Sequence, residues 1–350
     1  MASIGISDAT VVDYAHGLLD HGSVAAEQVE RFSLPGLDLT ATLASEGYAA
    51  LCRQALVDSP TYRDGGQSQV AVAVIDHLAR PDMPQAHWSS PTFGIGEFVQ
   101  GLEASGLDGL FDATHTIWQF FSASRGQGIQ TLQASGAFPP WEASFPLRNF
   151  LHWSYQAQGM RLVHAATLGR NGRGVLLAGA GGAGKSGTTL AGILHGLTSA
   201  GDDYVAIGLE GQQATAYPVI KLMKQDRAGL ARLGIDPVER ALGEPNWQGK
   251  YTFDFEDLVK GARARSLALS GILIPRISGV SKCRISPAPM RDALYGLLPN
   301  NLQQLPGGLR QGLSFVAALT RALPAYYLDL SSEPEDIAQT ISQFLEESRP

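Results

Sequence analysis

A glycine-rich segment with a lysine carries the clearest chemistry in the sequence. GAGGAGKS at 179–186 fits G-x-x-x-x-G-K-[ST], a pattern in which backbone N–H groups and the start of a helix surround phosphate oxygens. We expect Lys185 to reach the outer phosphates of a nucleotide and the Ser186 hydroxyl to bind Mg²⁺. The predicted nucleotide-binding residues are Gly179, Ala180, Gly181, Gly182, Ala183, Gly184, Lys185, Ser186 and Gly187. The alternative is a glycine-rich turn that holds no ligand.

An aspartate pair, Asp202-Asp203, follows the glycine-rich loop closely. A helix over 185–196 would travel roughly 18 Å from the phosphates, and a strand over 197–201 would return roughly 16 Å. The pair is therefore predicted to lie level with the loop. One aspartate would hold Mg²⁺ with Ser186, for which we assign Asp203, and Asp202 or Asp203 would take the proton of an attacking hydroxyl. A polar turn or a helix cap is the alternative for this pair.

Three further cations are weaker candidates for contact with substrate or phosphate. Arg276 directly follows an apolar strand, where a charge needs a carboxylate or phosphate partner. Lys221 and Lys250 lie in polar-bounded segments that could approach a nucleotide or an acceptor. For both lysines, a solvated side chain is the alternative.

The elements around the loop predict an alternating α/β domain. RLVHAATL, NGRG and GVLLAG read as a hairpin whose second strand leads into the loop, and KSGTTLAGILHG reads as the helix after it. DRAGLARLG and FEDLVKGAR read as helical pieces, and LALSGILIPRIS reads as a central apolar strand. The closing segment predicts a strand and then a helix capped by Ser331 or Ser332. This order is typical of nucleotide-binding folds.

The first part of the chain predicts a smaller α+β domain. VAVAVIDHL at 70–78 reads as a strand, and 96–111 has the apolar spacing of a helix. The prolines of FPPWEASFP discourage regular structure before an apolar helix that begins near Leu147. We therefore predict an α+β domain over 1–145, with a role in acceptor or partner recognition, and a mixed-sheet nucleotide-binding domain over 146–350.

Composition and charge exclude several function classes. The chain has 350 residues, long enough for two domains, and is 44% hydrophobic and 17% charged. The net charge of −7 disfavours nucleic acid and anionic membranes as partners. No run of about eighteen apolar residues predicts a membrane span, and the first residues lack the pattern of an export signal. We therefore expect a cytoplasmic protein, and the sequence leaves a homo-oligomer open.

The loop and GDDYV together resemble the HPr kinase/phosphorylase family, and the fold resembles more distantly that of the ATP-type phosphoenolpyruvate carboxykinases. The match is strongest to HPr-kinase-like serine kinases found in bacterial biosynthetic operons, including lasso-peptide clusters. Weaker matching stretches are FPLRNFLHW, GMRLVHAAT, AYPVIKL, ILIPRISG and LPAYYLDL, within about 138–330. The resemblance implies a P-loop kinase domain, and it adds His164 to the catalytic residues Asp202, Asp203 and Lys185. A buried core histidine is the alternative for His164.

The resemblance has limits that bear on the substrate. The glycine-rich C-terminal signature of true HPr kinases and the extended substrate motifs of the carboxykinases have no counterpart here, which argues against HPr and oxaloacetate as substrates. We predict transfer of the ATP γ-phosphate to a hydroxyl, by resemblance a serine of a peptide or protein. The alternatives are a small-molecule kinase, a regulatory module that binds nucleotide without transfer, and a structural role. The sequence identifies neither the acceptor nor the oligomeric state, and it does not separate ATP from GTP or settle whether the reaction runs in reverse.

Overall fold

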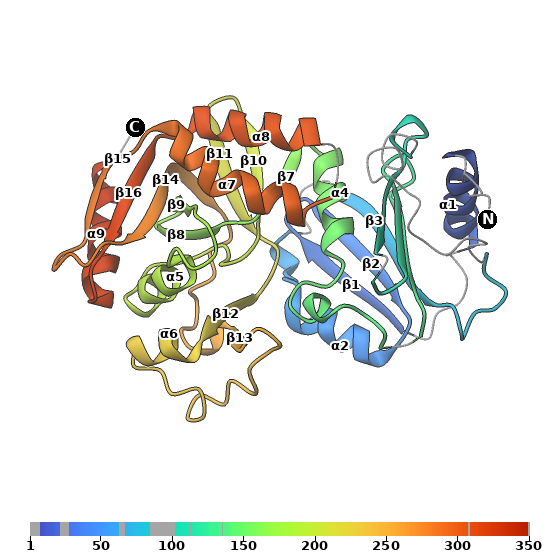
Figure 1. The fold of residues 1–350 in the computed structure, drawn as a ribbon, viewed down its shortest axis with the longest axis horizontal. Coiled ribbons are helices and arrows are strands. Elements are labelled where there is room, and N and C mark those ends of the chain that lie inside the picture. Colours follow the sequence, from blue (N-terminus) through green and yellow to red (C-terminus); the bar gives the residue numbers. More distant parts are fainter. Residues whose placement is uncertain are drawn as a thin grey trace, which may run out of the picture. The chain divides into compact units, whose positions relative to one another are not determined.

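The computed structural model describes residues 8–21, 28–62, 67–84, 102–112, 114–134, 136–306 and 309–348. The chain forms two compact units that divide between Gln158 and Gly159, with a short return to the first unit at Pro306 (Figure 1). The boundary expected at 145/146 falls ahead of helix α4 (Arg148–Ala157), which belongs to the first unit.

The first unit is built on a mixed six-stranded sheet in the order β1-β2-β3-β6-β5-β4. Strand β3 pairs in parallel with β2 and β6, and the outer pairs are antiparallel. Its strands are β1 (Gln28–Leu34), β2 (Leu37–Leu43), β3 (Ser68–Asp76), β4 (Asp108–Asp112), β5 (Ile117–Ser122) and β6 (Gln127–Leu132). Its helices are α1 (Asp8–His21), α2 (Glu46–Ala55) and α4, with short 3₁₀ turns at Pro60–Tyr62 and Pro140–Ala143.

The second unit is a mixed α/β structure around an eight-stranded sheet, with a separate two-stranded pair. The central strand β14 pairs in parallel with β9 and β16 and antiparallel with β11. The strands of the large sheet are β7 (Met160–Val163), β8 (Ala166–Arg170), β9 (Arg173–Leu177), β10 (Val205–Glu210), β11 (Gln213–Pro218), β14 (Leu267–Ile277), β15 (Arg284–Pro287) and β16 (Ala325–Leu330). The pair is β12 (Leu222–Asp226) with β13 (Lys250–Asp254), and the helices are α5 (Lys185–Leu194), α6 (Arg227–Arg232), α7 (Met290–Gln304), α8 (Leu309–Ala322) and α9 (Pro334–Glu347).

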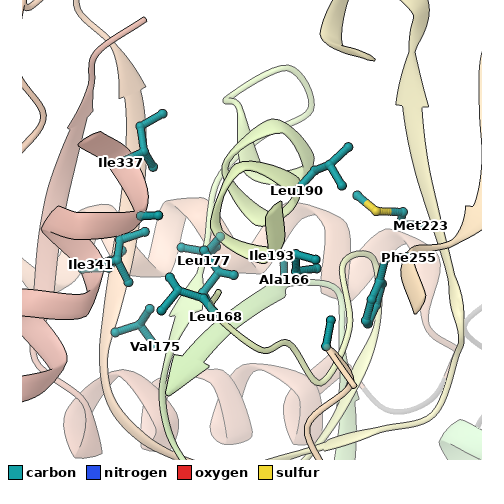
Figure 2. Close-up of a cluster of buried hydrophobic side chains, with 14 of the residues drawn as sticks. Ala166, Leu168, Val175, Leu177, Leu190, Ile193, Met223, Phe255, Ile337 and Ile341 are labelled. Atoms are coloured by element: carbon teal, nitrogen blue, oxygen red, sulfur yellow. The ribbon is translucent and has the colours of Figure 1, made fainter. Parts of the chain in front are cut away.

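Helices cover both faces of the large sheet. Successive residues of a strand point to opposite faces, so each strand contributes to two cores. In β9, Val175 and Leu177 join the core beneath α5 and α9, while Leu176 joins the core beneath α7 and α8. Figure 2 shows the first of these cores, where Ile193 of α5 lies beside Ala166 of β8, and Leu190 lies on the side toward Met223 of β12. Burial on both faces explains why GVLLAG is continuously apolar rather than alternating.

Several predicted elements are confirmed. The strand at 70–78 is β3, the helix near Leu147 is α4, DRAGLARLG contains α6, and LALSGILIPRIS is β14. The closing strand and helix are β16 and α9. The hairpin is confirmed for β8 and β9, where Asn171 and Gly172 both have positive φ, as a type I′ turn requires.

Other predicted elements are wrong. The helix over 96–111 does not continue to its end: Gly106 has a φ of 71° and β4 starts at Asp108, while 96–101 lie outside the described residues. FEDLVKGAR contains only a 3₁₀ turn, Phe255–Asp257, whose N-cap Asp254 accepts from the Glu256 N–H. Glu333, rather than Ser331 or Ser332, is the N-cap of α9. The Ser331 hydroxyl instead donates to Asp336 Oδ2.

Within the described ranges, no helix is both long enough and apolar enough to cross a membrane.

Candidate functional site

The glycine-rich loop joins β9 to α5 over residues 178–184. Gly182 and Gly184 have φ values of 82° and 96°, in the left-handed region that glycine adopts without strain. A Cβ on Gly184 would also lie 3.0 Å from Leu330 Cδ1, so this position has little room for a side chain. Helix α5 begins without a side-chain cap, and its first-turn N–H groups therefore face the loop as donors for an anion.

Lys185 lies at the first turn of α5 and folds back over the loop. Its Nζ donates to the carbonyl oxygens of Gly179, at 2.6 Å, and Ala180, at 3.3 Å. Burial lowers the pKa of Lys185, although the nearby charges of Asp202 and Asp203 act to raise it. The ammonium therefore lies between the loop and the aspartate pair.

Asp202 is almost fully buried, with 3% of its surface exposed. Burial and the charge of Asp203 raise its pKa to about 6, while the hydroxyl of Ser186 and the charge of Lys185 act to lower it. Its Oδ1 is buried and accepts no hydrogen bond from the described residues. A buried carboxylate oxygen without a donor is costly, and a cation at this position would remove the cost.

Asp203 is held by a histidine and a lysine. His164 Nε2 donates to Oδ1 at 2.7 Å, and Lys224 Nζ donates to Oδ2 at 3.0 Å. Burial acts to raise the pKa of Asp203, but the His164 hydrogen bond and the Lys224 charge outweigh it, so the pKa lies well below its usual range. Asp203 is therefore an ionised, oriented carboxylate, and 28% of its side chain is exposed.

His164 occupies a break in the first predicted strand. Strand β7 ends at Val163 and pairs with β10, while β8 begins at Ala166 and pairs with β9. The His164 backbone N–H donates to Asn301 Oδ1 on α7, at 2.7 Å. The break turns the ring toward Asp203, with its centroid 5.0 Å from that of Tyr204.

The loop, the aspartates and His164 line one cavity of about 220 Å³. Lys250 of β13 lines it too, whereas Lys221 and Arg276 are not among its lining residues. Arg276 instead pairs with the buried Asp329, with Nε 2.8 Å from Oδ1, and its guanidinium lies over the Tyr327 ring.

A second, larger cavity of about 430 Å³ adjoins the first beside α5, and both are lined by Gly184, Gly187, Arg232 and Ile277. Its walls are mainly apolar, with contributions from α5, α6 and the β16–α9 connection. Thr188 lines this cavity, and its buried Oγ1 has no hydrogen-bond partner among the described residues. The two cavities together offer a polar, glycine-lined end and an apolar end.

The sequence interpretation missed several residues of the first cavity: Lys224, Gln225, Asp226, Arg232 and Ile277. LMKQD carries no clear signal in the sequence, because three polar residues follow two apolar ones without alternation. The alternating burial of Met223, Lys224, Gln225 and Asp226 exists only in the structure, where β12 is brought to the loop by contacts distant in the sequence.

No group of three His, Cys, Asp or Glu side chains among the described residues is arranged to hold a metal ion. Mg²⁺ in nucleotide sites is typically held by one or two protein oxygens together with substrate phosphates and water. Ser186 and the unpartnered Oδ1 of Asp202 are hard oxygen donors of that kind, so the residues present fit Mg²⁺.

Comparisons with known proteins give little beyond this geometry. No protein-family description matches the sequence, and no curated protein matches it. Among solved structures, the chain is similar to the Hpr(Ser) kinase/phosphatase from Coxiella burnetii, at 14% sequence identity. The similarity covers 53% of this chain and 97% of that chain, with a TM-score of 0.29. A TM-score this low carries no inference, so membership of the HPr-kinase-like group stays a prediction.

Proposed function

We propose that this chain is a Mg²⁺-dependent phosphotransferase that moves the γ-phosphoryl group of ATP to a hydroxyl. By the resemblance of its loop and GDDYV segment, the acceptor is a serine of a peptide or protein. The observation that carries the proposal is that one cavity is lined by residues of the glycine-rich loop and by two aspartates in different environments. Asp202 is buried beside Ser186 with an unpartnered oxygen, and Asp203 is ionised and held by His164 and Lys224.

The loop and the adjoining cavity would bind the nucleotide. Backbone N–H groups of the loop and the first turn of α5 would donate to phosphate oxygens, and Lys185 would exchange its two carbonyl partners for the outer phosphate. The larger cavity has the apolar walls that a nucleobase requires, and Thr188 Oγ1 would donate to the nucleotide there. These features fit a nucleotide and leave ATP and GTP to be compared by experiment.

Ser186 and Asp202 would hold the metal ion. The sequence interpretation assigned Asp203 with Ser186, but the contacts favour Asp202, because Ser186 bonds to Asp202 whereas both oxygens of Asp203 already accept from cations. Bound Mg²⁺ would neutralise charge on the phosphates during transfer.

Asp203 would position the acceptor. Its partly exposed carboxylate can accept a hydrogen bond from an incoming hydroxyl and then its proton, while His164 and Lys224 fix its orientation. A carboxylate with a low pKa is a weak base. Its main contribution is therefore alignment of the hydroxyl with the phosphoryl group, as expected for a loose transition state.

The test is transfer of ³²P from γ-labelled ATP to a degenerate serine-peptide library in the presence of Mg²⁺. A matched library in which alanine replaces serine is the control. We expect label in the serine library only, and we expect Asp203→Asn to lower the rate by about 10²-fold, because the hydroxyl loses its alignment. Asp257→Asn, at an exposed position of the same unit, is the control and keeps the wild-type rate.

Two outcomes would decide against the proposal. Full activity of Asp203→Asn would remove Asp203 from the reaction. Tight binding of Mg²⁺ and ATP without transfer to any hydroxyl, in proteins, peptides or small molecules, would favour a regulatory module that responds to nucleotide occupancy.

A further inference from the structure

The first unit contains a cavity of about 300 Å³ that the phosphotransfer chemistry does not use. It lies between β4, β5, the 3₁₀ turn at Pro140–Ala143 and the start of α4. Half of its lining is apolar, including Phe111, Ile117 and Trp141, and the other half is charged or amide-bearing. This volume suits a small organic ligand.

A chain of buried polar side chains supports the polar wall. Asn149 Nδ2 donates to Gln119 Oε1 at 2.6 Å, Gln119 Nε2 donates to Gln130 Oε1 at 2.5 Å, and Gln130 Nε2 lies 3.4 Å from the Tyr48 hydroxyl. Tyr48 then donates to Glu142 Oε2 at 2.5 Å. Asn149 and Glu142, the two ends of the chain, both line the cavity.

Every donor in this chain points the same way, from Asn149 toward the Glu142 carboxylate. At one end of the chain, Asn149 Oδ1 is buried and accepts no hydrogen bond from the described residues. At the other end, Tyr48 and the Leu147 N–H both donate to Glu142 Oε2. A buried acceptor such as Asn149 Oδ1 is costly unless a donor reaches it.

The cavity also carries both signs of charge close together. Arg148 lines it beside Glu142, and its charge acts on the Glu142 carboxyl, whose pKa is raised by burial and lowered in part by Tyr48 and Arg148. The lining also includes aromatic side chains: Trp141, which is 39% exposed and meets His115 edge-on, and Phe111.

We propose that this cavity binds a free α-amino acid with an apolar or aromatic side chain. The ammonium group would donate to Glu142 and Asn149, the carboxylate would face Arg148, and the side chain would pack against Phe111, Ile117 and Trp141. An α-amino acid carries its ammonium and carboxylate groups on the same carbon atom, which suits a carboxylate and a guanidinium that share one small cavity.

The test is titration calorimetry of the full chain with L-phenylalanine and two analogues that each lack one charge, phenethylamine and 3-phenylpropionate. We expect L-phenylalanine to bind at least about tenfold more tightly than either analogue, the loss expected for one charge-assisted hydrogen bond. Trp141 fluorescence should change on binding, and Trp141→Phe should remove that change while binding persists.

Variants separate the two ends of the site. Arg148→Gln should bind L-phenylalanine and phenethylamine equally, and Glu142→Gln should do the same for L-phenylalanine and 3-phenylpropionate. Arg125→Gln, at an exposed ion pair with Asp20, is the control. If Glu142→Gln does not fold, Arg148→Gln alone still tests the assignment.

The proposal is overturned if no L-amino acid with an apolar side chain binds, or if either analogue binds as tightly as L-phenylalanine to the wild type. Equal weakening of all three ligands by Arg148→Gln would also overturn it. Because these measurements require neither nucleotide nor acceptor, their failure is distinct from failure of the proposed phosphotransfer.

Discussion

The two aspartates of the pair are neighbours in the chain, yet their surroundings give them opposite character. Burial raises the pKa of Asp202 to about 6, and His164 with Lys224 holds the pKa of Asp203 well below its usual range. Two neighbouring carboxylates whose pKa values are shifted in opposite directions are typical of sites where two acids have different tasks. The sequence interpretation assigned the metal to Asp203 and left the proton acceptor open between Asp202 and Asp203, because nothing in the DD dipeptide separates them.

Thr188 allows a test of the nucleotide site at a single residue. Thr188 lies in α5, and its hydroxyl is buried without a partner among the described residues. Valine has nearly the same shape as threonine. We expect Thr188→Val to leave stability unchanged or raise it by up to about 1 kcal/mol, because an unsatisfied buried hydroxyl is removed. We expect the same variant to weaken ATP binding by about tenfold, because a hydrogen bond to the nucleotide is lost. Thermal unfolding and calorimetric titration measure the two effects.

Thr189→Val is the matched control, since the Thr189 hydroxyl donates to the Lys185 carbonyl oxygen at 2.9 Å. It should lower stability instead. A Thr188→Val protein that binds ATP normally would show that the larger cavity does not hold the nucleotide.

At the scale of elements, the path back to the loop differs from the predicted one. Helix α5 ends at Leu194 rather than at 196, and residues 198–199 form only isolated bridges, with Gly169 and Arg263. The aspartates nevertheless line the same cavity as residues of the loop. Spacing therefore predicted where the pair lies even though the strand itself was wrong.

Strand register explains the position of Arg276. Asp329 of β16 lies directly opposite Arg276 of β14 and Arg284 of β15, and it is only 1% exposed. Its carboxylate accepts from Arg276 at 2.8 Å and from Arg284 at 2.9 Å. Arg276 was expected to have a carboxylate or a phosphate partner, and its partner is the Asp329 carboxylate.

Asp329→Asn tests this cross-strand pairing. The hydrogen bond from Arg284, with the charges of both arginines, lowers the pKa of Asp329. The ionised Asp329 therefore contributes its full stabilisation above the pKa of an aspartate in the unfolded chain, about 4. This stabilisation is lost as pH falls through the lower pKa of Asp329 in the folded protein. Because both guanidinium groups are partly exposed, we expect the variant to lose about 1–2 kcal/mol at pH 7.

Denaturant unfolding from pH 7 to pH 2 measures the effect. The variant should lose less stability on acidification than the wild type, and Asp257→Asn, at an exposed pair, should follow the wild type. Parallel pH curves for Asp329→Asn and the wild type would contradict a stabilising role of the pair.

At the scale of the whole molecule, each unit has its own core and its own candidate site. The two cavities proposed to bind the nucleotide are lined entirely by residues of the second unit, and the cavity proposed to bind an amino acid is lined by residues of the first. Because each proposed site lies within one unit, ligand binding at each site can be tested separately.

Hydrogen exchange with mass spectrometry can localise nucleotide binding. With Mg²⁺ and ATP at about ten times Kd, exchange in peptides covering 179–190 and 202–205 should slow by about tenfold, because binding opposes local opening. Excess EDTA with the same ATP should abolish most of this protection. Protection of equal size in the first unit would contradict a nucleotide site confined to the second.

The sequence by itself determined the loop, its flanking strand and helix, and the short distance to the aspartates. Those features depend on turn chemistry, hydrophobic periodicity and chain length, which act over a few residues. Only the tertiary structure decided that Lys224 holds Asp203, that Arg276 pairs with Asp329, and that Asn149 and Glu142 line one cavity. These contacts join distant segments, and burial, which sets their cost and their pKa shifts, exists only after the sheets have assembled.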